Sequence, residues 1–406
     1  MSVVSEPRVP EAAPQTTDCP SCGSHALKAF YSVDSVPVNS CVLMRTAEEA
    51  LTYPRGRVDM VFCEDCGFIF NRAFDLQLIE YSERYEETQG FSPTFNRFHE
   101  ALAKQVIERY GLNSKKVVEI GCGKGEFITM VCELGENEGV GFDPSYVPDR
   151  SRAAPSERVR FVTDFYSERY AGEDADFVCC KMTLEHIPRV EAFMRTVRRA
   201  AGGRPDTVVF FQVPEIGIIL RQRGFWDIYY EHCSYFSPES LADLFQRTGF
   251  EVRDVWTGYG DQYLMIEAVP APAAQAMETA GRADFVATLA AEVDSFAGAV
   301  ESIIDGWRKK LRGAAMRGER SVLWGSGSKA VSFLTTVGIT TEVEIVVDIN
   351  PHRQGMYMPG TGHRIVRPEA LRDYRPDNVI VMNPVYEREI AEQLHGMGLK
   401  PRIESL

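Results

Sequence analysis

The residues with the clearest chemical signal are three glycines at alternate positions, Gly121, Gly123 and Gly125. They follow the apolar, β-branched run Val117–Ile120 and precede the helical-looking segment Glu126–Leu134, so the pattern predicts a strand, a tight turn and a helix. Glycine lets the backbone of such a turn approach a ligand, and the helix end beyond it offers N–H groups. Glu119 lies at the predicted carboxyl end of the strand, where open α/β sheets bind ligands. An acid at this position favours a cationic or hydroxyl-rich ligand over a phosphate. The alternative is that the glycine turn only packs the helix on the strand.

Acidic residues follow the next two predicted strands. Asp143 comes directly after Gly139–Phe142, where an acid is expected to bind two ribose hydroxyls bidentately. Asp164 ends a third run, 160–163, and is placed to accept a hydrogen bond from an adenine amino group. The alternative for Asp143 is a helix-capping role. The spacing of these acids behind the glycine turn therefore predicts a nucleoside-containing cofactor.

Three further side chains complete the candidate cofactor site: Tyr85, Ser92 and Lys181. Lys181 ends a fourth apolar run, 175–181. Tyr85 and Ser92 lie upstream of the glycine turn with two other aromatic residues, Tyr81 and Phe91. We expect this upstream segment to close over the cofactor, with simple packing of the aromatic rings as the alternative.

Titratable side chains crowd a loop rich in tyrosine, which contains Tyr229, Glu231 and His232. Polar groups packed among aromatic rings are how a base is tuned toward neutral pH. His232 is the candidate general base, with Glu231 or Tyr229 to orient or polarise it. His186 follows the fourth run and is expected to face the cofactor. The alternatives are a structural aromatic cluster for the loop and a capping or core histidine for His186.

Four cysteines form two Cys-x-x-Cys pairs, each followed by glycine: Cys19 and Cys22, Cys63 and Cys66. The short spacing lets both sulfurs of a pair face one ion, so the pattern predicts a four-thiolate zinc site. Such a site has no open position and is structural rather than catalytic. Redox dithiols and unrelated cysteines are the alternatives.

Composition restricts the class of protein. With 406 residues, 44% of them hydrophobic, the chain is long enough for two or three domains. The net charge of −14 argues against a nucleic-acid partner. The sequence contains neither a long apolar run for a membrane span nor a signal peptide, so we expect a cytoplasmic protein whose cysteines are reduced. Residues 1–18 are polar and rich in proline, and we expect a loose tail.

The remaining pattern predicts three folded parts: a zinc-binding domain over 19–75, a sheet domain over 76–270, and a helical linker with a second α/β domain over 271–406. Helices are expected at 76–85 and 95–110, after the cap at Ser237, and over 275–316. A linker is expected at 270–274. The last domain repeats the strand and glycine turn at Gly325–Lys329. It serves either as a scaffold or as a small-molecule site in which Lys329 and the segment 355–363 hold an anion.

This order of motifs resembles the three-domain SAM-dependent C-methyltransferases, known members of which methylate C3 of nucleotide-linked 4-keto deoxysugars in antibiotic pathways. The resemblance covers nearly the whole chain from Cys19 onward. It is carried by the four cysteines, by the segments 119–125 and 184–188, and most specifically by Tyr229-Tyr-Glu-His232. It implies that His232 is the base, that Tyr229 and Glu231 line the substrate pocket, and that His186 is a second active-site histidine. The chain departs from the family pattern at Gly258–Gln262 and at Gly325–Lys329, so the resemblance supports the chemistry better than the substrate.

The prediction is therefore an α/β protein in which a class I SAM methyltransferase sheet is flanked by an N-terminal zinc domain and a C-terminal Rossmann-like domain. It binds S-adenosyl-L-methionine and structural Zn²⁺, acts as a monomer or homodimer, and methylates carbon beside a carbonyl. His232 takes the proton, while Tyr229 and His186 stabilise the oxyanion. The main alternative is methyl transfer to oxygen or nitrogen of a small metabolite. A zinc-ribbon nucleic-acid binder and a nicotinamide reductase are further alternatives, disfavoured by the acidic charge and the glycine spacing.

Overall fold

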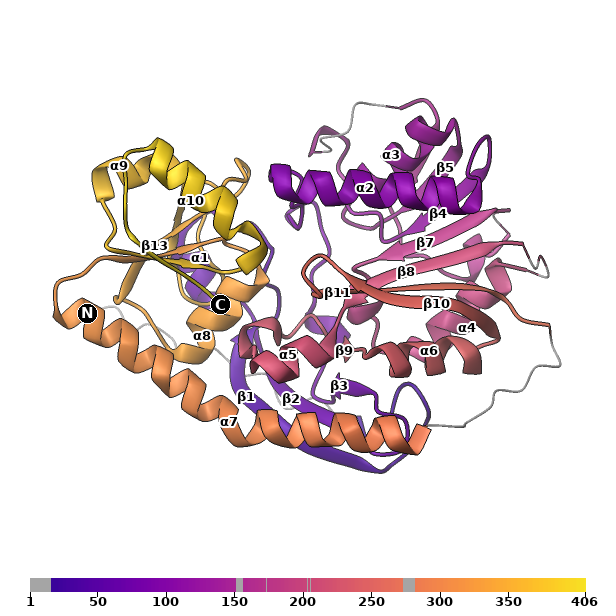
Figure 1. The fold of residues 1–406 in the computed structure, drawn as a ribbon, viewed down its shortest axis with the longest axis horizontal. Helices are drawn as coiled ribbons and strands as arrows, with labels where there is room; N and C mark the ends of the chain where they lie inside the picture. The colour runs from indigo at the N-terminus through magenta and orange to yellow at the C-terminus, as the bar shows by residue number, and fades with distance from the viewer. Residues whose placement is uncertain (1–15, 151–155, 173, 203, 205, 273–281) are drawn as a thin grey trace.

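The computed structural model describes residues 16–150, 156–172, 174–202, 204, 206–272 and 282–406 (Figure 1). Most of the predicted tail and part of the predicted linker at 270–274 lie outside these residues. The described chain forms three sheets, here called the N-terminal, central and C-terminal sheets. None of the described helices is both long and apolar enough to cross a membrane.

The central sheet has seven strands in the order β10-β11-β8-β7-β4-β5-β6. Its strands are β4 (Lys116–Ile120), β5 (Glu138–Phe142), β6 (Val159–Val162), β7 (Phe177–Lys181), β8 (Val208–Pro214), β10 (Phe250–Gly258) and β11 (Tyr263–Pro270). The first five are parallel and β11 runs antiparallel between β8 and β10. Because β4 has β5 on one side and β7 on the other, the chain reverses its winding direction at β4, which is where such sheets bind ligands.

Helices cover both faces of the central sheet, because its buried strands are apolar on both faces. On one face, α2 (Pro93–Tyr110) and α3 (Glu126–Gly135) pack against a row of side chains that includes Val117, Phe177 and Phe210. On the other face, α4 (Val190–Ala200) and α6 (Pro238–Arg247) pack against the alternate residues. The capping box between Ser237 and Ser240 begins α6 where the sequence predicted it.

The N-terminal sheet has the order β1-β2-β3-β9, with β1 (Leu27–Pro37), β2 (Arg55–Cys63), β3 (Ile69–Asn71) and β9 (Ser234–Tyr235). Strand β9 belongs to the loop that carries Tyr229 and His232, so this loop is hydrogen-bonded directly into the N-terminal sheet. The short helix α1 (Ala47–Thr52) lies between β1 and β2. The N-terminal sheet therefore helps to position the candidate base, which a boundary drawn at residue 75 does not reveal.

The C-terminal sheet has five parallel strands in the order β14-β13-β12-β15-β16. These strands are β12 (Ser321–Trp324), β13 (Val343–Val347), β14 (Arg364–Val366), β15 (Asn378–Val381) and β16 (Arg402–Ser405), accompanied by α8 (Ser328–Val337), α9 (Leu371–Tyr374) and α10 (Glu387–Gly396). Its first strand in chain order, β12, lies between the second, β13, and the fourth, β15, just as β4 lies between β5 and β7 in the central sheet. Both sheets thus have a ligand-binding switch point beside their first strand.

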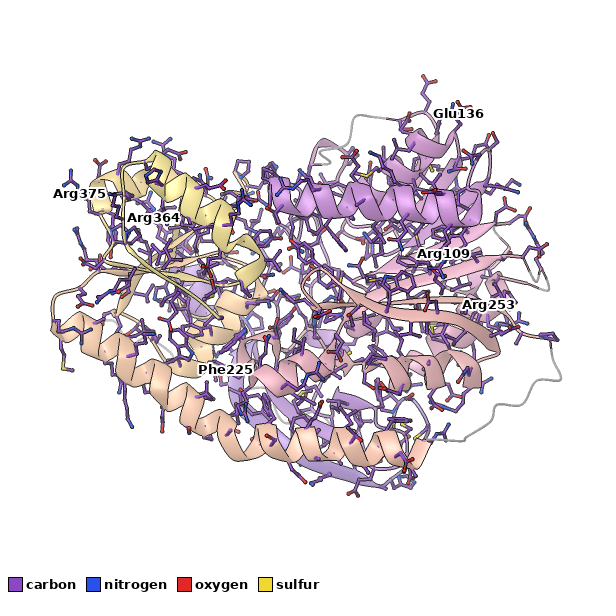
Figure 2. The ribbon with its side chains drawn as sticks, in the orientation of Figure 1. Arg109, Glu136, Phe225, Arg253, Arg364 and Arg375 are labelled. Atoms are coloured by element: carbon purple, nitrogen blue, oxygen red, sulfur yellow. The ribbon has the colours of Figure 1, made fainter. Side chains whose placement is uncertain are left out.

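The long helix α7 (Arg282–Met316) runs along the N-terminal sheet toward the C-terminal sheet (Figure 1). Its apolar side packs on β1, where Phe296 contacts Phe30 and Tyr31 at ring distances of 6.0 and 5.5 Å. The loop helix α5 (Ile216–Gln222) leads into Phe225, labelled in Figure 2, whose ring stacks on Phe333 of α8 at 6.0 Å. These apolar contacts join the N-terminal and C-terminal sheets in one core, and Val61 and Phe70 of the N-terminal sheet belong to a second core on one face of the central sheet.

The helix predicted at 76–85 is wrong. Only a single 3-10 turn, Leu76–Leu78, forms, with Asp75 as its cap. The apolar residues of this segment do not share one helix face. Tyr81 instead packs edge-on against Tyr85 at 5.4 Å, and the Glu80 amide donates to Asn39.

Candidate active site

The glycine turn connects β4 to α3 with all three glycines in left-handed backbone conformations. The φ angles of Gly121, Gly123 and Gly125 are +68°, +53° and +76°. A side chain on Gly121 would overlap Thr183, and one on Gly123 would come within 2.6 Å of the Glu87 carboxylate. The sequence therefore requires glycine at these positions to let the backbone approach the cavity wall.

Two acids flank this turn. The buried Glu119 accepts a hydrogen bond from the Ile128 amide at 3.0 Å, and burial raises the pKa of Glu119 to about 7 against the opposing pull of the nearby Lys181. Asp143 accepts from the Gly123 amide at 2.9 Å and from the Ser145 amide and hydroxyl at 2.7 Å. The aspartate thus fixes the turn, and its carboxylate lies at the cavity wall.

A cavity of about 380 Å³ lies at this carboxyl edge. Its lining includes most of the predicted site: Tyr85, Glu119, Gly121, Gly123, Asp143, Asp164, Lys181, His186, Tyr229 and His232. Its volume falls in the range of small-molecule sites, and the left-handed glycine turn forms part of its wall. These features fit a nucleoside-containing cofactor bound against the turn.

Two predicted cofactor residues have protein partners in this cavity. Lys181 lies beside His99 and over the Phe127 ring at 3.9 Å, and burial lowers the pKa of Lys181. Asp164 accepts from the Tyr170 hydroxyl at 2.6 Å and pairs with Arg169. Asp164 is therefore already held at the rim of the cavity.

Ser92 lies apart from this set. Its hydroxyl caps α2 by accepting from Thr94 and Phe95, and it donates to Glu389 at 2.8 Å. Ser92 lines a neighbouring cavity rather than the one at the glycine turn. The structure thus separates Ser92 from the residues with which the sequence grouped it.

The two histidines meet at the inner wall. The rings of His186 and His232 are 4.7 Å apart in an edge-on arrangement, and the Tyr229 hydroxyl lies 3.1 Å from Nε2 of His232. Burial lowers the pKa of His232 and lowers that of His186 to about 4. Both imidazoles are therefore neutral near pH 7. Burial also raises the pKa of Tyr229, so its hydroxyl keeps its proton.

The bonding of His186 argues against its predicted role as an oxyanion stabiliser. Its Nδ1 lies 2.9 Å from the carbonyl oxygen of Glu231, which can only accept, so Nδ1 carries the proton. Nε2 of the neutral ring is then an acceptor. His186 can receive a hydrogen bond from a ligand hydroxyl but cannot donate one to an oxyanion.

The Glu231 carboxylate points away from His232. It accepts from Asn39 at 3.1 Å, from the Ser40 amide at 3.1 Å and from the Tyr85 hydroxyl at 3.2 Å, and burial raises its pKa. The side chain lines neither the cavity at the glycine turn nor its neighbour. Glu231 thus ties the N-terminal segment and Tyr85 to the loop that carries Tyr229 and His232, whereas the sequence led us to expect that it orients the base or lines the substrate pocket.

Glu185 is the site residue that the sequence reasoning missed. It is 1% exposed, one carboxylate oxygen lies 4.0 Å from Nε2 of His232, and neither oxygen has a hydrogen-bond partner in the described part of the chain. Burial raises the pKa of Glu185 to about 8. Its place beside His186 in the segment 184–188 was visible in the sequence, but nothing there showed that it points inward.

The four cysteines predicted to bind metal come together. Their ligand atoms lie within 4.8 Å of one another, with Cys19 and Cys66 at 3.7 Å and Cys22 and Cys63 at 3.6 Å between sulfurs. Tetrahedral Zn–S bonds of about 2.3 Å place sulfurs about 3.8 Å apart. The cluster therefore has the size of a four-thiolate zinc site.

The predicted anion site in the C-terminal part does not form. The Lys329 ammonium donates to Asp227 at 2.9 Å and to Gln262 at 3.2 Å. The segment 355–363 packs instead on the N-terminal region, where the Gly360 amide donates to the Ala50 carbonyl at 2.7 Å. The two features predicted to hold an anion are thus used in separate contacts.

Comparison with known proteins finds two family matches and one curated relative along most of the chain. Residues 95–255 match the family described as "Methyltransferase domain", and residues 270–400 match "C-methyltransferase C-terminal domain". C-methyltransferase NovU of Streptomyces niveus is 27% identical over 397 residues, which cover 92% of this chain and 91% of that protein.

Two solved structures were also similar over part of the chain. A putative S-adenosylmethionine dependent methyltransferase from Listeria monocytogenes has 14% identity and a TM-score of 0.34, covering 43% of this chain and 100% of its own. Magnesium protoporphyrin IX methyltransferase (ChlM) from Synechocystis has 15% identity and a TM-score of 0.35, and the match covers 44% of this chain and 84% of that protein. The two domain matches, together with the similarity to NovU along 92% of the chain, show that the chain is a SAM-dependent methyltransferase in which a methyltransferase domain is followed by a domain of the C-methyltransferase C-terminal type.

Proposed function

We propose that this C-methyltransferase uses His232 to remove a proton from carbon beside a carbonyl, on a nucleotide-linked keto-deoxysugar or a related small metabolite. The observation that carries the proposal is the position of His232. Its side chain lines both the cavity at the glycine turn and the neighbouring cavity. A carbon acid that enters from the second cavity therefore meets the imidazole beside the cofactor site.

The residues at the glycine turn fit SAM. The turn backbone approaches the ligand, the Asp143 carboxylate is at the position expected for the ribose hydroxyls, and Glu119 lies at the strand end. Tyr85 and Lys181 line the same cavity. Bound SAM supplies an electrophilic methyl group to the carbon nucleophile.

His232 has the protonation state that a base needs. The Tyr229 hydroxyl, which keeps its proton, lies 3.1 Å from Nε2 of the neutral His232 ring, and in this proposal Nε2 is the unprotonated nitrogen. When the Tyr229 hydroxyl turns to the substrate carbonyl, it frees the Nε2 lone pair and donates to the oxygen that gains charge. His186 offers its Nε2 to a substrate hydroxyl. Alignment of base, carbon and methyl group supplies the main rate advantage.

Glu185 completes this arrangement as a positioning residue. Once His232 takes up a proton it becomes a buried cation, and buried charges need a partner. The unpartnered Glu185 carboxyl, 4.0 Å away, is close enough to ionise and stabilise the imidazolium. Glu185 therefore acts on the acidity of His232 rather than on the substrate.

The four-cysteine cluster holds a structural zinc ion in this proposal. It ties the loop at Cys19 to the hairpin that ends in Cys63, and so supports the N-terminal sheet that carries β9. The protein works in a reducing cytoplasm in this proposal, where the cysteines outside the cluster stay as thiols. The division into domains at residues 18, 75 and 270, and a monomer or homodimer, complete the proposal.

Solvent deuterium exchange tests the class of reaction. With SAM left out, the wild-type enzyme should catalyse exchange at the carbon beside the carbonyl of a nucleotide-linked keto-sugar. Mass spectrometry after SAM addition should then place the new methyl group on that carbon. Methylation of the same compound at oxygen or nitrogen, with no carbon exchange, would support the alternative instead.

A further inference from the structure

Three side chains at the inner wall of the glycine-turn cavity form a compact group: Glu185, His186 and His232. All three line the cavity, and one ligand atom from each lies within 4.8 Å of the other two. They come from two segments of the chain, 184–188 and the loop that carries Tyr229. Two imidazoles and one carboxylate are a set of ligands that suits a divalent transition-metal ion.

His186 has the hydrogen bonding of a metal ligand. Its Nδ1 donates to the Glu231 carbonyl at 2.9 Å, which leaves the lone pair of Nε2 for a ligand. Metal-binding histidines almost always donate their other ring N–H to a carboxylate, a backbone carbonyl or a water molecule in this way. The backbone of the loop therefore already orients this ring as a metal site would require.

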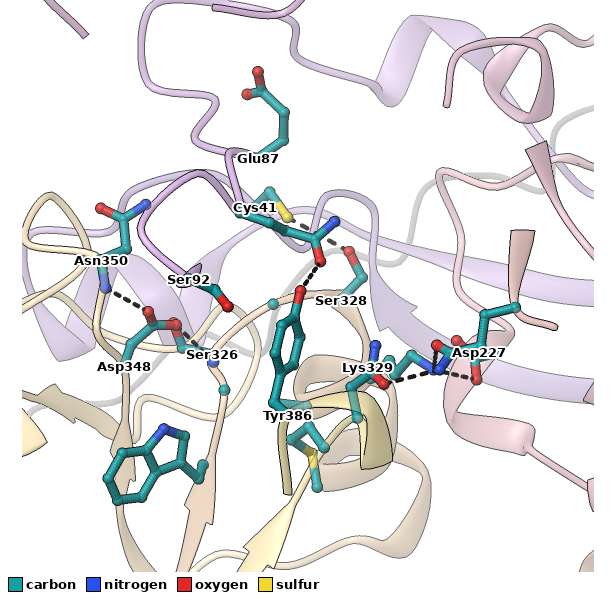
Figure 3. A pocket seen from close by; sticks show the side chains of 18 of the residues that line it. Cys41, Glu87, Ser92, Asp227, Ser326, Ser328, Lys329, Asp348, Asn350 and Tyr386 are labelled. Carbon is teal, nitrogen blue, oxygen red and sulfur yellow. Dashed lines mark hydrogen bonds and ion pairs between the residues drawn. The ribbon is translucent and has the colours of Figure 1, made fainter. Parts of the chain in front are cut away.

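Glu185 is a buried carboxyl group that lacks a partner. In the described part of the chain it is the one carboxyl group with both oxygens covered from solvent and without a hydrogen bond. The acids of the neighbouring cavity differ, since Figure 3 shows Asp348 bonded to Ser326 and Asp227 paired with Lys329. A buried polar group without a partner is costly, and a bound cation would supply the missing contact.

The three side chains are close enough to contract around one ion. Zn–N and Zn–O bonds of about 2.0–2.1 Å place tetrahedral ligand atoms about 3.3 Å apart. The Glu185 oxygen and Nε2 of His232 are 4.0 Å apart, so they would approach by about 0.7 Å, and no pair by more than about 1.5 Å. Glu185 gives up no side-chain hydrogen bond in this movement, and the ion replaces the contact between His232 and the Tyr229 hydroxyl.

We infer that Glu185, His186 and His232 bind a divalent ion such as Zn²⁺, and that the bound ion blocks methyl transfer. The Glu185 carboxyl releases its proton, and its carboxylate and the two imidazole lone pairs bind the ion. The ion then holds the lone pair that His232 would use as a base, so no proton leaves the substrate carbon. This blocking rests on the proposed function, whereas binding of the ion does not.

Binding of a second zinc ion tests the site. The whole enzyme, saturated with zinc at the four-cysteine cluster, is titrated with Zn²⁺ in a calorimeter without substrate. One further ion per chain should bind at micromolar concentration, whereas Mg²⁺ should not bind at millimolar concentration, because it prefers oxygen ligands. Co²⁺ added to the zinc-loaded enzyme should give visible absorption without the intense bands of thiolate ligands, which separates this site from the cysteine cluster.

Matched variants locate the second ion. Glu185→Gln and His186→Asn should each weaken its binding at least tenfold. Glu87→Gln changes another carboxyl group of the same cavity and should change the affinity for the ion less than about threefold. Wild-type affinity for S-adenosylhomocysteine, measured without added zinc, shows in each case that the variant is folded.

Exchange at the substrate carbon tests the blocking. Saturating Zn²⁺ should slow solvent deuterium exchange by the wild-type enzyme at least tenfold, and the exchange that remains in His186→Asn should be insensitive to the same concentration. The inference is overturned if no second ion binds below millimolar concentration, if Glu87→Gln weakens it as much as Glu185→Gln, or if exchange continues with the ion bound. A chain that binds the second ion but shows no exchange even without it would refute the proposed base, and the blocking with it, while the metal site would stand.

Discussion

Replacing Glu185 by glutamine should slow proton abstraction about a hundredfold at pH 7. A carboxylate 4.0 Å from Nε2 of His232 stabilises the imidazolium by about 4 kcal/mol at an effective dielectric constant of about 20. Because burial raises the pKa of Glu185 to about 8, ionising it at pH 7 costs about 1.4 kcal/mol. The net contribution of about 2.7 kcal/mol corresponds to a factor of about 100 in rate.

The pH dependence makes the Glu185 prediction specific. The wild-type rate should rise as Glu185 ionises and level off above pH 8, where the full Coulomb term gives a wild-type to E185Q ratio of about 1,000. The assay is the rate of solvent deuterium exchange between pH 6 and 9, with S-adenosylhomocysteine affinity as the control for an intact site. A ratio below about five across this range, or the same pH profile in both proteins, would refute the reasoning.

The same substitution should stabilise the fold. A carboxyl whose pKa is raised in the folded state favours unfolding increasingly as pH rises from its unfolded value toward about 8. Glutamine removes this effect, so E185Q should gain up to about 3 kcal/mol in the free energy of unfolding at pH 7 and almost nothing near pH 4. Urea unfolding at the two pH values measures the difference, and equal stabilities at pH 7 would show that Glu185 is not destabilised by burial.

Three further predictions concern the surroundings of the base. Gly121→Ala should reduce S-adenosylhomocysteine affinity at least tenfold and lower stability by about 1–3 kcal/mol, because the φ of +68° and the contact with Thr183 exclude a side chain; unchanged titration and unfolding curves would contradict this. Tyr229→Phe should slow exchange by about 100-fold through loss of one oxyanion donor while His232 stays neutral, and a change in substrate affinity alone would argue for a binding role. Cys63→Ser should lower bound zinc, measured by elemental analysis, from one ion per chain and cost several kcal/mol of stability; full zinc content in the variant would reject the four-thiolate site.

The features that depend on the spacing of nearby residues could be predicted from the sequence. The glycine turn, the strand ends that carry Glu119 and Asp143, and the two cysteine pairs follow from residue spacing, and the structure brings each set together. The helix at 76–85 failed because Tyr85 donates to Glu231 and the Glu80 amide donates to Asn39, and both partners lie far away in the sequence. Periodicity alone cannot register such tertiary contacts.

The roles of individual side chains in the site could not be predicted, because they depend on the direction in which each side chain points. Glu231 and Glu185 are both buried acids next to a histidine in sequence, and only the structure shows that Glu231 faces Asn39 while Glu185 faces His232. The proton on Nδ1 of His186 likewise follows from a backbone carbonyl contributed by a distant loop. The sequence shows that a strand and glycine turn recur at Gly325–Lys329, but only the structure shows that Asp348 accepts from the Ser326 amide as Asp143 accepts from the Gly123 amide.

The central claim is that His232 makes the carbon nucleophile, and exchange in the His232→Asn variant tests it most directly. Asparagine keeps a polar side chain of similar size but cannot accept a proton near neutral pH. With S-adenosylhomocysteine bound at wild-type affinity, we predict that this variant loses solvent deuterium exchange beside the substrate carbonyl and forms no methylated product, whereas His186→Asn keeps measurable exchange. Exchange at the wild-type rate in His232→Asn, or its loss only in His186→Asn, would contradict the account.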